Sequence, residues 1–93
     1  QAHQDIWDFH SELLDKNIKH IFFNGNNSFE SISDVKDWRE SYISPYDPTQ
    51  TFDSVLRSNG HQPVSMNSWH YGRDAHSFWA RHMLQYILKN NII

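Results

Sequence analysis

The sequence predicts a small, helix-dominated α/β protein; a small mostly-α domain is the alternative. Two observations support this fold class. Residues 73–89 repeat apolar side chains at the steps i, i+3, i+4 and i+7, which is typical of one face of an α-helix. Residues 18–24 form a short β-branched and aromatic run followed by a Gly-Asn-Asn-Ser turn cluster, which is typical of a strand. With 93 residues, the chain is one domain at most, or the C-terminal half of a larger domain.

The first element that we expect is a helix over residues 2–16. Acidic residues near its beginning suit the positive end of the helix dipole, and Asn17 is a suitable end. One face carries Ile6, Phe9, His10, Leu13, Leu14 and Asn17.

The strand predicted at 18–24 needs a partner. Its apolar residues are consecutive at Ile21, Phe22 and Phe23, as in a strand that is buried on both faces. The other extended candidate, residues 62–66, is weakened by Pro63, which cannot donate to a sheet ladder. We therefore expect the strand to pair with another segment or with a second copy of the chain.

Two short helices are predicted in the middle of the chain. The first spans 33–41, with Ser33 or Asp34 as its cap and Val35, Trp38 and Tyr42 on its apolar side. The second spans 51–58, with Thr49 or Thr51 as its cap and Asn59-Gly60 as its end. Prolines 45 and 48 make the intervening segment a loop. With the helix over 73–89, the prediction is four helices and one main strand.

Composition argues against several kinds of function. The net charge is -3 and the eight Lys and Arg residues are scattered, so neither a nucleic-acid interface nor an anionic-membrane surface is predicted. The absence of Cys excludes disulfides and thiolate metal sites. His70, His76 and His82 are six residues apart, and helical side chains at that spacing point in different directions, so no metal site is predicted. The turn at 25–27 is not a phosphate-binding loop, because it has one glycine and no following Lys, and no cofactor is expected.

His70 is the candidate catalytic residue. It comes just before the last helix, and its ordinary pKa of about 6.5 suits a general base. A base also needs a second group, a side chain or a backbone carbonyl, to fix its tautomer. A loop histidine stacked on Trp69 or Tyr71 is the structural alternative, and the sequence leaves both open.

The run His70-x5-His76-x2-Trp79-Ala80, followed by an apolar helix, resembles the C-terminal block of SGNH (GDSL-like) hydrolases. The resemblance extends from about Ile18 to the C-terminus. It includes residues 44–48 and Phe52-x3-Leu56-x3-Gly60, which are similar to an insert of some environmental and phage-encoded members. It implies the C-terminal half of a flavodoxin-like α/β/α sandwich and hydrolysis of esters or acetyl groups, with His70 as the base.

The sequence departs from the family at two points. It contains no Gly-Asp-Ser block, and Asn67 or Ser68 stands where the family has the Asp that orients the histidine. The resemblance therefore implies a segment that contributes the late histidine and is not catalytically complete alone. The chain begins at Gln1 rather than Met, which is consistent with a piece of a longer protein. The alternative is a non-catalytic, α-rich interaction or structural module. The expected partners are accordingly a missing N-terminal segment or a second copy.

Overall fold

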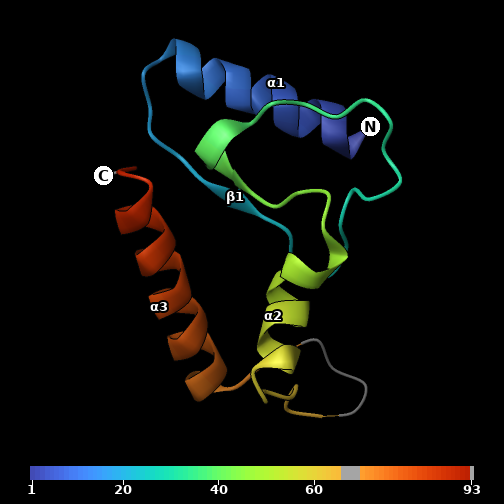
Figure 1. The fold of residues 1–93 in the computed structure, drawn as a ribbon, viewed down its shortest axis with the longest axis vertical. Coiled ribbons are helices and arrows are strands. Elements are labelled where there is room, and N and C mark those ends of the chain that lie inside the picture. Colours follow the sequence, from blue (N-terminus) through green and yellow to red (C-terminus); the bar gives the residue numbers. More distant parts are fainter. Residues whose placement is uncertain (66–69, 93) are drawn as a thin grey trace.

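The computed structural model describes residues 1–65 and 70–92, and within them the chain is helix-dominated with a small parallel sheet (Figure 1). The α-helices are α1 (Ala2–Asp15), α2 (Phe52–Ser58) and α3 (Arg73–Lys89). Strand β1 (Phe22–Phe23) pairs in parallel with β2 (Tyr42–Ile43), so that Phe22 lies opposite Tyr42. Short 3-10 turns occupy Arg39–Ser41 and Pro48–Gln50. None of the helices in this part of the chain has the length and apolar character to cross a membrane.

Strand β1 connects two separate groups of packed side chains. We call the first the Trp38 cluster; it contains His3, Trp7, His10, Phe22, Phe29, Trp38, Tyr42 and Tyr46. We call the second the Trp79 cluster; it contains Phe52, Val55, Leu56, Tyr71, Ala75, Phe78, Trp79 and Met83. Successive strand residues point to opposite faces. Phe22 accordingly contacts Trp38, with ring centroids 6.4 Å apart, whereas Phe23 contacts Trp79 at 5.0 Å.

The two long helices consequently lie on opposite sides of the strand pair. Phe22 packs against Phe9 and His10 of α1, and Phe23 packs against Trp79 of α3. Figure 1 shows β1 between α1 and α3. The arrangement is helix, sheet and helix in three layers, with a sheet of only two strands among the described residues.

All three helices end with the same backbone motif. After each last turn one residue takes a positive φ: Asn17 (58°), Gly60 (87°) and Asn91 (53°). The next amide then donates to a carbonyl five residues earlier, as in Ile18 to Leu13 (2.9 Å) and His61 to Leu56 (2.9 Å). This Schellman arrangement is typical of Gly and Asn, which tolerate the left-handed conformation. It confirms the ends predicted at Asn17 and at Asn59-Gly60.

Gly60 provides a direct test of this helix end. We expect Gly60→Ala to lower the free energy of unfolding by about 1–2 kcal/mol, because an L-residue is strained in the left-handed region. A Cβ at Gly60 would meet no atom within 4 Å, so backbone strain is the expected cause. Gly25→Ala is the matched control, because its Cβ would also meet nothing within 4 Å and Gly25 has no positive φ. Urea denaturation measures both. Equal stabilities of the two variants would contradict the strain argument.

The prediction of a helix over residues 33–41 was wrong. Residues 35–38 have no regular structure, and a 3-10 turn follows at Arg39–Ser41. The Tyr46 hydroxyl accepts hydrogen bonds from the Lys36 amide and from Trp38 Nε1, both at 2.9 Å. A short isolated helix gains little by itself, so these tertiary bonds decide the conformation. Tyr42, expected on the helix, instead forms β2.

The strand predicted at 18–24 is shorter than expected. Only Phe22–Phe23 pairs with β2, because the residues before it are committed to the end of α1. The Ile18 amide completes the Schellman motif, and the Ile18 carbonyl accepts from His20 Nδ1 at 2.8 Å. Pro63, in the segment considered as a partner strand, forms an isolated antiparallel bridge with Tyr71.

The apolar face predicted for α3 was confirmed, whereas the face of α1 was only partly correct. Ala75 and Trp79 are buried. The other residues at the predicted spacing are half-buried: Phe78, His82, Met83, Tyr86, Ile87 and Asn90. On α1, Phe9 and Leu14 are 51% and 58% exposed, and the buried residues are His3 and His10. The predicted face thus lies slightly to one side of the observed one.

Candidate functional site

The backbone that follows the exposed His70 side chain is held by contacts with residues 63 and 64. The His70 carbonyl accepts a hydrogen bond from the Val64 amide at 2.8 Å. The next residue, Tyr71, forms an isolated antiparallel β-bridge with Pro63. Two residues later the chain enters α3, whose N-cap is Gly72. The imidazole is therefore presented to solvent at the start of a long helix.

Tyr71 anchors this loop to α2. Its side chain is 6% exposed, its ring meets Phe52 edge-on at 5.5 Å, and its hydroxyl donates to Asp53 Oδ1. Arg57 Nε lies 3.0 Å from both oxygens of the same carboxylate. Burial, and then the hydrogen bond to Asp53, raise the pKa of Tyr71, so the phenol stays protonated as a donor at neutral pH.

A surface hollow of about 250 Å³ adjoins the loop. Among the described residues it is lined by His61, Gln62, Gly72, Arg73, Asp74 and Ala75. Gly72 is two residues from His70, so the exposed imidazole and the hollow belong to the same end of the molecule. Arg73 and Asp74 supply one charge of each sign, and the hollow therefore has no strong preference for an anion or a cation.

The partners predicted for His70 lie outside the described residues. These partners are Asn67 and Ser68. Trp69, the alternative stacking partner, also lies outside the described residues. His76 is exposed in the first turns of α3, with its ring 5.9 Å from that of Phe52. Within the described ranges 1–65 and 70–92, no group of three or more His, Asp or Glu side chains is placed to hold a metal ion.

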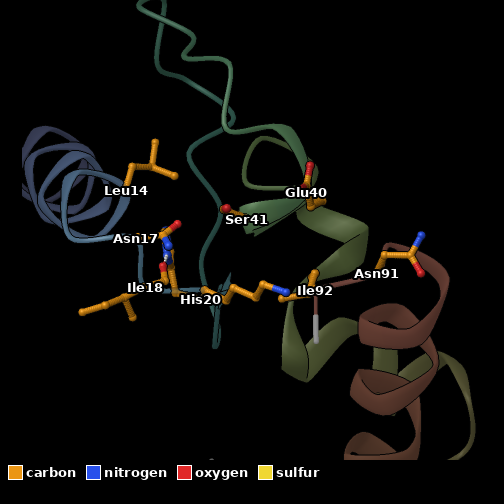
Figure 2. A pocket seen from close by; sticks show the side chains of 9 residues that line it. Leu14, Asn17, Ile18, His20, Glu40, Ser41, Asn91 and Ile92 are labelled. Atoms are coloured by element: carbon orange, nitrogen blue, oxygen red, sulfur yellow. Dashed lines mark hydrogen bonds between the residues drawn. The ribbon is translucent and has the colours of Figure 1, made fainter.

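Figure 2 shows a second hollow, of about 150 Å³. Figure 2 shows Leu14, Ile18 and His20 on one side of it and Glu40 and Asn91 on the other. It is lined by Leu14, Asn17, Ile18, Lys19, His20, Glu40, Ser41, Asn91 and Ile92. It adjoins the C-terminal end of α3, whose 17 residues span about 25 Å, whereas His70 precedes the N-terminal end. The two hollows are separate places on the molecule.

Sequence reasoning missed the anchor of the histidine loop. The spacing of Asp53 and Arg57, four residues apart on a helix, is a recognisable ion-pair signal. Nothing local links Tyr71 to Asp53, because the two residues are 18 positions apart. The contact between His10 and His20 was also not predicted.

Comparison with known proteins provides no relative for this chain. No family model, no curated protein and no solved structure matches it.

Proposed function

We propose that this chain is the late-histidine segment of an SGNH-like hydrolase and that His70 is its general base. The observation that carries the proposal is the exposed His70 side chain on a fixed backbone at the start of α3, beside a hollow. A general base needs access to a substrate and a second group that holds its tautomer. In this proposal Asn67 or Ser68 supplies that second group.

The layer order is further support. Parallel strands with a helix on each face are typical of doubly wound α/β sheets, in which ligands bind beyond the carboxyl ends of the strands. In the proposed flavodoxin-like domain, β1 and β2 would be two strands of a larger sheet. The 93 residues contain no Gly-Asp-Ser block, so the nucleophilic serine would come from a different segment.

A second candidate function, an interaction module, is favoured by the exposed apolar surface. Eight large apolar side chains among the described residues are at least 43% exposed: Phe9, Leu14, Ile18, Phe23, Val35, Val64, Leu84 and Leu88. The radius of gyration is 14.3 Å, whereas a compact domain of this length has about 12 Å. Such a surface fits another part of the same domain or a second copy of the chain.

Labelling with a fluorophosphonate distinguishes the two functions. We expect the complete product of the gene that encodes these residues to be labelled on one serine outside residues 1–93. We expect the isolated 93-residue chain to remain unlabelled, because no serine here has the Gly-Asp-Ser context. Peptide mass spectrometry identifies the modified residue. A labelled serine within residues 1–93 would refute the divided site, and an unlabelled complete product would favour the interaction module.

A further inference from the structure

The two buried residues of α1, among its fully described residues 2–15, are both histidines. His3 and His10 are 2% and 3% exposed and lie seven positions apart, so they share one face. Buried helix positions are usually occupied by apolar residues, and a buried imidazole requires a hydrogen-bond partner. Each of these rings has one, outside the helix.

The hydrogen bonds of Tyr46 require a neutral His3. The Tyr46 oxygen accepts from the Lys36 amide and from Trp38 Nε1, both at 2.9 Å, which uses both of its lone pairs. The Tyr46 hydroxyl must therefore donate its own hydrogen to His3 Nε2, 2.8 Å away. A ring that accepts at Nε2 carries its hydrogen on Nδ1 and has no charge. Protonation of Nε2 would place a third donor against the Tyr46 oxygen.

The second contact is a hydrogen bond between two imidazoles. His20 Nδ1 lies 2.8 Å from the Ile18 carbonyl, which can only accept, so this nitrogen carries hydrogen. Neutral His20 therefore accepts at Nε2, and His10 Nδ1 donates to it across 2.7 Å. One hydrogen lies between the two rings. When both rings are protonated, two N–H groups face each other and the bond is lost.

Burial disfavours a charge on His10, which is 3% exposed. Its ring lies 5.3 Å from both the Trp7 and Trp38 rings. Burial, and then His20, hold the pKa of His10 below its ordinary value of 6.5. The unfolded chain therefore binds a proton at His10 more tightly than the folded chain does. The contribution of neutral His10 to the free energy of unfolding is fully present above about pH 6.5 and falls as the pH decreases toward the folded pKa.

Charged side chains also lie near His3 and near His20. Near His3 the facing groups are the Tyr46 hydroxyl and Asp34, and Asp34 pairs with Lys36 at 2.8 Å. Near His20 they are Lys19 and Glu40, which line the same hollow with opposite charges. Figure 2 labels His20 and Glu40 at this hollow. His20 itself is half-buried and lines this hollow.

We propose that α1 is released by acid. Neutral His3 and His10 dock the helix, and it detaches when His3 and both rings of the His10–His20 pair are protonated. Helices α2 and α3 do not use these contacts. They meet in the Trp79 cluster, where the histidines in ring contact are His61, His76 and His82 rather than His3 or His10. The inference is independent of the function proposed for His70.

Hydrogen exchange monitored by mass spectrometry tests the proposal. Between pH 7.5 and pH 5, after correction for intrinsic exchange rates, we expect the protection of residues 2–15 to fall at least tenfold while that of 73–89 is retained. In the variant His3→Gln/His10→Gln, whose amides can donate and accept but do not titrate, α1 should keep its protection at both pH values. The control His61→Gln/His76→Gln, which alters two histidines outside α1, should behave like the parent chain.

Three outcomes would overturn the proposal: unchanged protection of α1 in the parent chain, joint loss of α1 and α3, or an equal acid response in His3→Gln/His10→Gln. If that variant does not dock α1 at pH 7.5, nitrogen chemical shifts of the parent imidazoles decide. We expect both His3 and His10 to be neutral with hydrogen on Nδ1. A charged ring at either position at pH 7.5 would refute the mechanism.

Discussion

Replacing Trp38 with alanine is expected to lower the free energy of unfolding by about 3–5 kcal/mol, the usual cost of truncating a buried Trp. Trp38 is 3% exposed, and its ring meets the Trp7 and Tyr42 rings edge-on at 4.9 Å each. Its Nε1 also donates to Tyr46, so the substitution removes one of the donors that hold the hydroxyl. For a small domain with a total stability of about 5–15 kcal/mol, this loss is large.

Urea denaturation followed by circular dichroism measures the effect. Trp38→Phe is the matched variant: it keeps a large ring but loses the N–H, and we expect its stability to lie between those of the parent and Trp38→Ala. Val35→Ala, at a position that is 62% exposed, should lie within about 0.5 kcal/mol of the parent. If Trp38→Ala were as stable as Val35→Ala, the Trp38 cluster would not be a core.

The sequence predicted those elements whose signal is local. The apolar repeat of α3 is long enough to average over single residues, and α3 begins and ends where it was predicted, at 73–89. Thr51 caps α2 by accepting from the Ser54 amide, as its residue type indicates. The Gly and Asn residues at the helix ends are equally local signals.

The elements that were predicted wrongly depend on contacts with residues that are distant in the sequence. Trp38 was assigned to a helix because its spacing from Val35 is helical, but its indole bonds to Tyr46, and Val35 remains exposed. Strand β2 has two residues, too few for any periodicity, and it exists because Phe22 and Phe23 lie beside it. Spacing alone cannot predict a parallel pair formed across about 20 positions.

The candidate site also combines a local feature, which the sequence predicts, with a long-range contact, which it does not. The position of His70 immediately before a helix follows from the sequence pattern, and the structure confirms that α3 begins three residues later. The anchoring of the loop through Tyr71 and Asp53 does not follow from it, because that contact joins α2 to the start of α3. The role of His70 as a base stays a prediction.

The most direct test of that role is a comparison of two histidine variants in the complete gene product. His70→Ala should reduce kcat/KM for a small acyl ester by about 10²–10⁴-fold, the usual contribution of a general base. His76→Ala is the matched control, because it is a second exposed histidine six positions away and has no catalytic role in this account. Both side chains are exposed, so equal thermal unfolding should show that both variants fold. A large loss in His70→Ala alone is the predicted result; equal kcat/KM values for the two variants would contradict the assignment of His70.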